Sequence, residues 1–143
     1  MPKLLKGGIF SDHRGQLTFM NEFDAAPVKR FYLINHPDKK VVRAWHAHKV
    51  ESRWFYCTKG RFDFRTLPLS AVENTDTADH VETFVLDAQE PQLLEIPPGH
   101  AHGFRALEEN SELLVFADFL LGENPDDHYR FESKNWTDWG SEA

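Results

Sequence analysis

The chain has 143 residues, which suffices for one domain with a hydrophobic core and leaves little room for a second. It carries 23 acidic against 16 basic residues, a formal net charge of -7, so a broad basic surface for nucleic acid is excluded and any anion site must be local. Its single cysteine, Cys57, excludes an internal disulfide and a zinc site built from thiolates.

We expect no signal peptide at the N-terminus. Met1 to Gly8 lacks the long apolar region and the small-residue cleavage site of a signal peptide. No later apolar run approaches the roughly 20 residues that a membrane helix needs. Together with the free cysteine, which fits a reducing compartment, these features lead us to expect a cytoplasmic protein without a membrane partner.

Short β-favouring runs with a period of two recur along the chain, and no 3.6-residue period is sustained over three turns. This pattern predicts an all-β fold, either a sandwich or a barrel. The expected strands are Gln16–Asn21, Lys29–Asn35, Val41–His46, Arg53–Thr58, Arg61–Leu67, His80–Leu86, Gln92–Ile96, Gly103–Leu107 and Leu113–Leu120.

The connections between these runs are mostly short. The long exception runs from Pro68 to Asp79, and we expect it to be solvated and the most mobile segment. The tail from Gly122 is acidic but rich in large aromatic residues, which predicts a docked extension, with a short helix after Asn124-Pro125. We therefore expect a single domain over residues 1–143, with a core of about residues 12–121 and an extension over 122–143.

Two histidine motifs stand out. The first is Arg43–Lys49, in which His46 and His48 are two residues apart and so share one face of a strand. The second is Ile96–Phe104, in which a Pro-Pro-Gly turn precedes His102 and can place its ring at the mouth of the same cavity. The two motifs together predict one interior pocket lined by histidines.

This pairing of motifs resembles the cupin superfamily and implies a jelly-roll β-barrel. Metal-binding cupins carry a glutamate in the first motif, and the corresponding position, seven residues before Gly60, is Arg53. A guanidinium has no lone pair to donate and repels a cation, so we expect neither a metal nor another cofactor. Glu51 is expected to face away from the pocket.

Further motifs resemble a narrower family. Asp12–Gly15, Lys29–Tyr32 and Arg43–Lys49 are similar to the metal-independent dTDP-4-keto-6-deoxyhexose 3,4-ketoisomerases, also called WxcM-like proteins. The second histidine motif is more similar to that of the related dTDP-4-dehydrorhamnose 3,5-epimerases. Those epimerases use a tyrosine as general acid at a position that here holds Val115 or Phe116, and this departure favours the ketoisomerase reaction.

The resemblance and the chemistry of enediol formation together give each residue a role. We expect His46, His48 and Tyr32 to be catalytic, because imidazole titrates near neutral pH and a phenol can bond an enediolate oxygen. The expected substrate-binding residues are Arg14, Lys29, Arg43, Arg53 and His102. Strict alternation faces Arg43 away from the pocket, so its role rests on the resemblance. No role is expected for His13, His36, His80 or His128, and the Asp126-Asp127 pair is expected to be solvated.

Three alternatives stay open at this point. They are a 3,5-epimerase acting on the same class of substrate, a metal-dependent cupin enzyme using His46, His48 and His102, and a non-catalytic sugar-nucleotide-binding cupin. The resemblance further implies a nucleotide-sugar substrate, dTDP-linked, and a homodimer.

Overall fold

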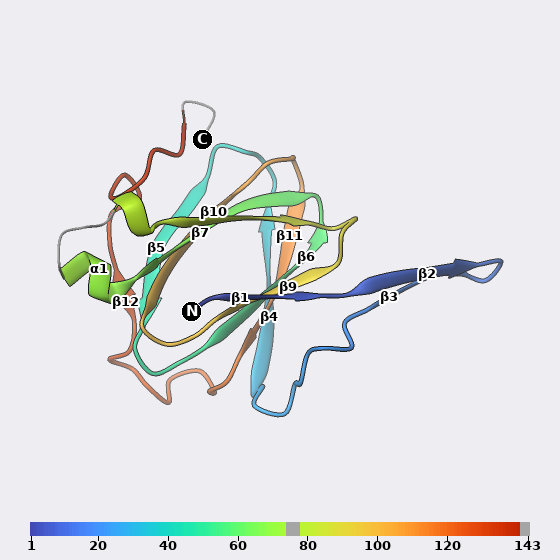
Figure 1. The fold of residues 1–143 in the computed structure, drawn as a ribbon, viewed down its shortest axis with the longest axis horizontal. Coiled ribbons are helices and arrows are strands. Elements are labelled where there is room, and N and C mark those ends of the chain that lie inside the picture. The colour runs from blue at the N-terminus through green and yellow to red at the C-terminus, as the bar shows by residue number, and fades with distance from the viewer. Residues whose placement is uncertain (74–77, 141–143) are drawn as a thin grey trace.

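A computed structural model of the chain describes residues 1–73 and 78–140. Two five-stranded antiparallel sheets face each other, in the orders β1-β9-β6-β11-β4 and β12-β5-β10-β7-β8, and β2 and β3 form a separate hairpin that projects to one side (Figure 1). The strands are β1 Lys3–Lys6, β2 Gly8–Asp12, β3 Gly15–Phe19, β4 Arg30–His36, β5 Val42–His48, β6 Arg53–Lys59, β7 Arg61–Pro68, β8 Glu82–Asp87, β9 Gln92–Ile96, β10 His100–Ala106, β11 Ser111–Ala117 and β12 Tyr129–Arg130.

The all-β jelly-roll prediction is confirmed, although the two large sheets share no strand and the barrel stays open between them. All nine expected strands are present, as β3 to β11. The pattern missed β1, β2 and the two-residue β12, which are short and take their order from pairing with β9, β3 and β5.

The expected long loop after Pro68 is partly helical. It contains α1 (Leu69–Glu73) and a 3-10 helix (Ala78–His80), and the N–H of Leu69 donates to the carbonyl of Gly99. The expectation of a solvated connection is wrong for Leu69 and Ala71, which are buried. Residues 74–77 of the same segment lie outside the described part of the chain.

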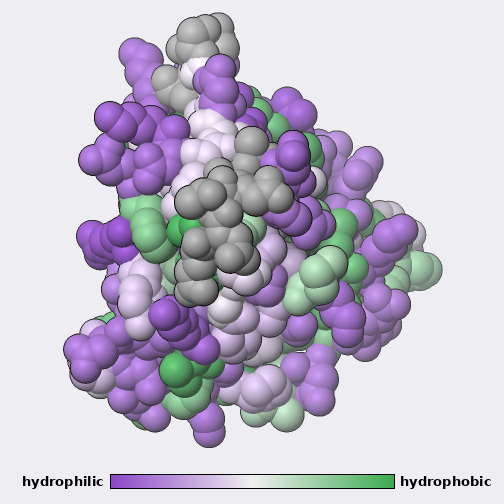
Figure 2. All heavy atoms as spheres, turned by 60° about the vertical axis from the view of Figure 1, so that its left-hand side comes forward, coloured by the Kyte–Doolittle hydropathy of each residue, from purple (hydrophilic) through white to green (hydrophobic). Residues whose placement is uncertain are grey.

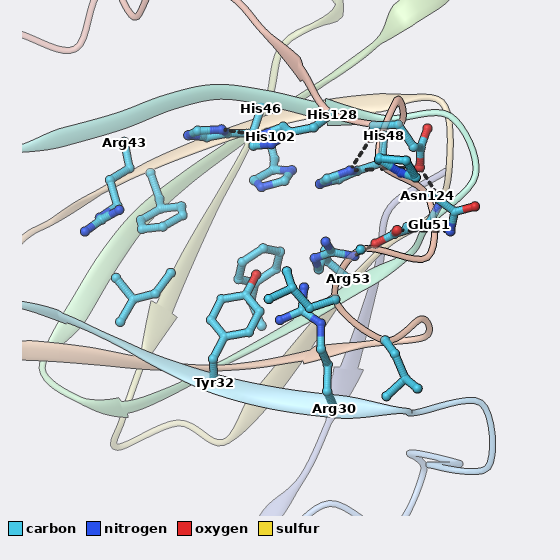
Figure 3. Close-up of a pocket in the computed structure, with 18 residues that line it drawn as sticks. Arg30, Tyr32, Arg43, His46, His48, Glu51, Arg53, His102, Asn124 and His128 are labelled. Atoms are coloured by element: carbon cyan, nitrogen blue, oxygen red, sulfur yellow. Dashed lines mark hydrogen bonds and ion pairs between the residues drawn. The ribbon is translucent and has the colours of Figure 1, made fainter.

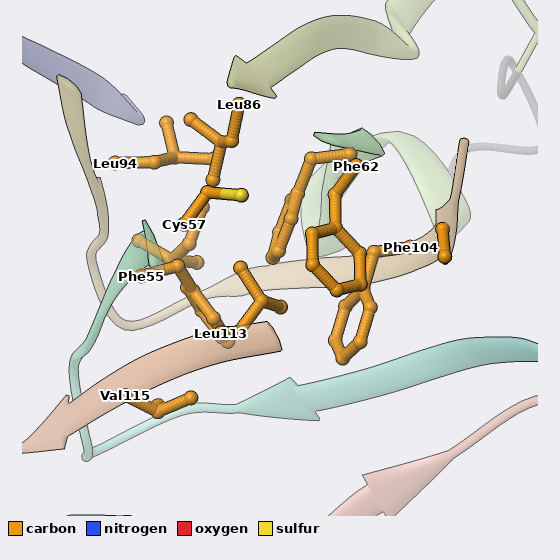
Figure 4. Packing of buried hydrophobic residues seen from close by; sticks show 11 residues of the cluster. Phe55, Cys57, Phe62, Leu86, Leu94, Phe104, Leu113 and Val115 are labelled. Carbon is orange, nitrogen blue, oxygen red and sulfur yellow. The ribbon is translucent and has the colours of Figure 1, made fainter. Parts of the chain in front are cut away.

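The main hydrophobic core fills the space between the two large sheets (Figure 4). Phe55, Phe62 and Phe64 pack against the ring of Phe104 in this core. Cys57 lies in the same core, where burial raises the pKa of its thiol to about 12. Cys57 is thus a core side chain. Because Phe55 and Phe104 also line the cavity described below, the core forms the floor of that cavity.

The predicted docking of the C-terminal tail is confirmed. Trp136 and Trp139 pack on the buried ring of Trp45, on the outer face of the second sheet, and the indole N–H of Trp45 donates to the carbonyl of Asn135. Trp45 therefore faces the tail while its neighbour His46 lines the cavity.

The short helix expected after Asn124 is absent, and residues 121–126 form turns and bends instead. The Asp127 side chain is instead tied to the loop after β5, where it accepts from the backbone N–H of Lys49. Among the described residues, no helix is long and apolar enough to cross a membrane. The face around α1 is mainly hydrophilic, with small separate apolar areas (Figure 2).

Candidate active site

A cavity of about 420 Å³ opens between the two large sheets (Figure 3). One side carries the histidines of β5 and β10, and Tyr32 and Arg30 rise from β4 on the opposite side. Segment 120–128 of the tail closes part of the mouth. The polar side chains that line the cavity are Arg30, Tyr32, Arg43, His46, His48, Glu51, Arg53, His102, Asn124, Asp127 and His128.

Four imidazoles gather in this cavity, where the sequence predicted three. His46 and His48 lie two apart on β5, and His102 on β10 stands directly opposite His46 in the antiparallel register. His102 is only 5% exposed, so it lies deep in the cavity and not at its mouth, because β10 already begins at His100. The fourth ring, His128, lies with its centroid 5.3 Å from those of both His46 and His48.

Burial holds these imidazoles in their neutral form. It lowers the pKa of His46 to about 4, with further lowering from His128 and Arg130. Burial followed by the charge of Arg53 lowers the pKa of His48, and burial lowers the pKa of the enclosed His102 well below its usual value. All of them are therefore uncharged near neutral pH and can accept a proton.

His48 has its tautomer fixed by the tail. Its Nδ1 lies 2.7 Å from the backbone carbonyl of Asp127, and because a carbonyl only accepts, Nδ1 carries the hydrogen. In a neutral ring this leaves Nε2 unprotonated. Nε2 of His48 therefore has a free lone pair that can accept a proton.

Asp127 organises the loop beside the site. Its carboxylate accepts hydrogen bonds of 2.7 to 3.1 Å from the backbone N–H groups of Lys49, Val50 and Glu51. Burial opposes its ionisation, but these hydrogen bonds lower its pKa overall. The expectation of a solvated Asp126-Asp127 pair is wrong for Asp127, which is 6% exposed.

Arg53 lines the cavity, as the resemblance implied, but it is paired. Its Nη1 lies 2.8 Å from a carboxylate oxygen of Glu51, and both side chains are buried. The other carboxylate oxygen of Glu51 accepts from the amide of Asn124 at 3.1 Å. The expectation that Glu51 faces away is therefore wrong; it lies two residues before Arg53, in the loop that precedes β6.

Arg43 reaches the cavity rim because the strand pairing is irregular. His102 pairs with His46, but Phe104 pairs with Arg43, so Ala44 and Trp45 together oppose the single residue Gly103. This β-bulge shifts the alternation, and Arg43 lines the same cavity as His46 although the two are three residues apart. Strict alternation was therefore the wrong assumption.

The guanidinium of Arg43 is held by a buried histidine. Its Nε donates to Nε2 of His36 at 3.0 Å, and the His36 ring packs between Phe62 and Phe104. His36 therefore fixes the direction of Arg43.

Two predicted binding residues do not line the cavity of this chain. Arg14 lies in the turn of the β2–β3 hairpin, where it is 75% exposed and paired with Asp12. Lys29 is exposed and precedes β4. The alternation of β4 instead directs Arg30 into the cavity together with Tyr32, with its guanidinium 5.0 Å from the centre of the Tyr32 ring. The spacing of two between Arg30 and Tyr32 was a signal that sequence analysis could have used.

Among the described residues, no group of three His, Cys, Asp or Glu side chains is arranged to hold a metal ion. Arg53, the residue seven positions before Gly60, is ion-paired with Glu51.

Comparison with known proteins places this geometry in context. Residues 2–135 match the family described as FdtA: WxcM-like, C-terminal. The chain is 31% identical over 116 residues to the "Probable low-salt glycan biosynthesis epimerase Agl13" of Haloferax volcanii, covering 73% of this chain and 69% of that protein. It is 30% identical over 91 residues to the spore coat polysaccharide biosynthesis protein SpsL of Bacillus subtilis, which covers 60% of this chain and only 55% of that protein.

Solved structures share the fold. A double mutant of the QdtA 3,4-ketoisomerase from Thermoanaerobacterium thermosaccharolyticum, in complex with TDP, aligns with a TM-score of 0.70 at 27% identity, over 91% of this chain and 87% of that one. The rmlC epimerase from Mycobacterium tuberculosis aligns with a TM-score of 0.74 at 19% identity, over 91% of this chain and 68% of that one.

Proposed function

Because the chain belongs to the WxcM-like family, we propose that it is a sugar-nucleotide isomerase that moves the carbonyl of a nucleotide-linked 4-keto-6-deoxyhexose from C4 to C3. The reaction removes the C3 proton, passes through an enediol and returns a proton to C4. The observation that carries the proposal is the fixed tautomer of His48, which leaves a lone pair on Nε2 in a cavity lined by arginines.

His48 takes the C3 proton on Nε2, and His46 is the shuttle that supplies a proton to C4. Tyr32 and Arg53 donate hydrogen bonds to the oxygen on which negative charge develops. His102, enclosed behind His46 and His48, contacts the sugar from the cavity floor.

The ketoisomerase reaction is favoured over the 3,5-epimerase reaction by the position of the tyrosine. The epimerase register falls on Val115 or Phe116, neither of which can donate a proton, and Val115 is fully buried in the core. Val115 pairs directly with Tyr32 across β11 and β4, so the phenol in this cavity comes from the neighbouring strand.

Arginines at the rim bind the diphosphate of the substrate. Arg43 and Arg30 offer planar guanidinium groups from opposite sides of the cavity, which suits paired hydrogen bonds to phosphate oxygens. TDP is bound in the QdtA structure, and we extend a dTDP-linked substrate to this chain on that basis. The binding roles expected for Arg14 and Lys29 stay predictions, as does the cytoplasmic location.

We also propose a homodimer. Within the described residues the β2–β3 hairpin pairs with no other strand, and its Phe10 and Leu17 are exposed. Phe31 and Leu33 are exposed on the edge strand β4. A second copy that covers these apolar side chains explains their exposure, and light scattering after gel filtration measures the expected doubled mass.

Incubation with dTDP-4-keto-6-deoxyglucose in deuterated water tests the reaction. Deuterium at C3 and C4, detected by NMR, supports ketoisomerisation. Deuterium at C3 and C5 indicates epimerisation, and no incorporation indicates a binding protein, so either result refutes the proposal.

The role of His48 has its own test. His48→Asn should abolish exchange at C3 while nucleotide-sugar affinity stays within a few-fold, because an amide fills the space without accepting the proton. Undiminished exchange at C3 in this variant would refute the role of His48 as base.

A further inference from the structure

His128 links the buried histidines to solvent, although it lies outside every motif that the sequence offered. It is exposed at the cavity mouth, whereas His46 and His48 are half-buried and His102 is enclosed. Its Nε2 lies 3.1 Å from Nδ1 of His46, and its ring stacks on His48 at an interplanar angle of 26°. Among the four imidazoles it is the one that water reaches most freely.

The backbone fixes His128 in this place from both sides. Asp127, the preceding residue, is held by the loop after β5 through its side chain and by His48 through its carbonyl. The following residues form β12, where Tyr129 and Arg130 pair with Ala47 and His46. A ring anchored this firmly keeps its hydrogen bond to His46 without an ordering cost at each turnover.

His46 and His48 differ in where a proton can go. The Nδ1 hydrogen of His48 is bound to a carbonyl, which cannot accept the proton itself. Nδ1 of His46 faces another imidazole nitrogen, which can both accept and donate. Only His46 of this pair therefore has a partner through which a proton can pass.

We propose that His128 relays protons from bulk water to His46, a role that rests on the proposed isomerase function. His128 takes a proton from water on Nδ1 and passes its Nε2 proton to Nδ1 of His46. His46 then gives its Nε2 proton to C4 of the enediolate, while the proton of the C3 hydroxyl passes to the C4 oxygen, which leaves the carbonyl at C3. Each ring gains one proton and loses one, and the proton that His48 took from C3 returns to water after the product leaves.

The electrostatics of the site suit this direction of transfer. Burial, Arg130 and Arg53 lower the pKa of His128, so it does not retain a proton at neutral pH. The enediolate brings a negative charge into the cavity only during the reaction, which draws the proton inward at that stage.

Deuterium incorporation at C4 of the same keto sugar, with and without added imidazole, tests the relay. In His128→Ala we expect the incorporation rate to fall by about tenfold or more, since positioned proton transfer contributes at least that much. Free imidazole should restore it, because the vacated space opens to solvent. His128→Gln can still hydrogen-bond to His46 but cannot relay a proton, so it should be equally slow and gain nothing from imidazole. His80→Ala, at an exposed histidine outside the cavity, is the matched control and should match the wild type.

Several results would overturn the relay. They are a wild-type incorporation rate in either variant, a loss in His128→Ala that imidazole does not relieve, or failure of both variants to fold by circular dichroism. Affinity for dTDP, measured by calorimetry, should stay within a few-fold in both variants. Absence of deuterium incorporation by the wild-type protein would refute the isomerase proposal itself, so the two failures are distinguishable.

Discussion

Removing the Asp127 carboxylate should destabilise the fold far more than removing its neighbour. Asp127→Ala deletes the acceptor of three backbone N–H groups, of which that of Glu51 belongs to a buried residue. A buried donor left without a partner costs about 1–3 kcal/mol, and the N–H groups of the exposed Lys49 and Val50 recover part of their loss from water. We expect a decrease in the free energy of unfolding of about 2–4 kcal/mol.

Urea denaturation followed by circular dichroism measures this change, with the exposed Asp126→Ala as the matched control. Asp126→Ala should change the free energy of unfolding by less than about 0.5 kcal/mol. The Asp127 contribution has a lowered folded-state pKa, so it is present above the unfolded carboxyl pKa and is lost as pH falls through the folded value. Equal effects of the two substitutions at neutral pH would refute the capping role of Asp127.

Five further outcomes are expected. The pKa of His46 is lowered to about 4 and that of His48 is lowered as well, so both rings stay neutral at the ordinary histidine value of 6.5. We therefore expect kcat/KM to stay constant as pH falls through 6.5 and to decline only below it. A decline centred at or above 6.5 would contradict the proposal that both imidazoles act in their neutral form. Because these folded-state values are lowered, the unfolded chain binds more protons, and the free energy of unfolding should also fall as pH drops below the ordinary value. His36→Phe keeps the packing but removes the acceptor of Arg43, so KM should rise on the order of tenfold with little change in kcat, measured by steady-state kinetics. Gly103→Ala drives a methyl group into Ala44 and should lower the free energy of unfolding by about 1–3 kcal/mol in urea titrations. Dialysis against a chelator should leave activity unchanged; loss of activity that a divalent metal restores would favour the metal-dependent alternative.

The histidines of β5 and β10 were predictable because strand periodicity is local. His46 and His48 share a face in any regular strand, and the sequence Pro97-Pro98-Gly99 predicts the turn before β10. Strict alternation alone placed Arg43 on the wrong face, because the β-bulge opposite Gly103 is a property of the pairing between two strands. The sequence of β5 alone therefore cannot predict the position of the bulge.

Asp127 and His128 could not be assigned for a related reason. Their roles depend on contacts with residues 46–51, nearly eighty positions earlier, and an Asp-Asp-His run in an acidic tail has the composition of a solvated segment. Arg30 is a different case, since its spacing from Tyr32 was available in the sequence and the resemblance drew attention to Lys29 instead.

Residues 124–128 of the tail contact the polar side chains of the candidate site. Asn124 donates to Glu51, which pairs with Arg53; the Asp127 carbonyl fixes the tautomer of His48; and His128 bonds to His46. Each of these contacts joins residues 124–128 to a polar side chain of the cavity. Undocking of the tail would therefore break all three contacts. Glu51 would lose its hydrogen bond from Asn124, His48 would lose the carbonyl that fixes its tautomer, and His46 would lose its hydrogen bond to His128. The stability of the docked tail and the proposed activity of His46 and His48 thus depend on the same hydrogen bonds. Trp136→Ala removes a ring that packs on Trp45 outside the cavity, and it should lower both turnover and the free energy of unfolding.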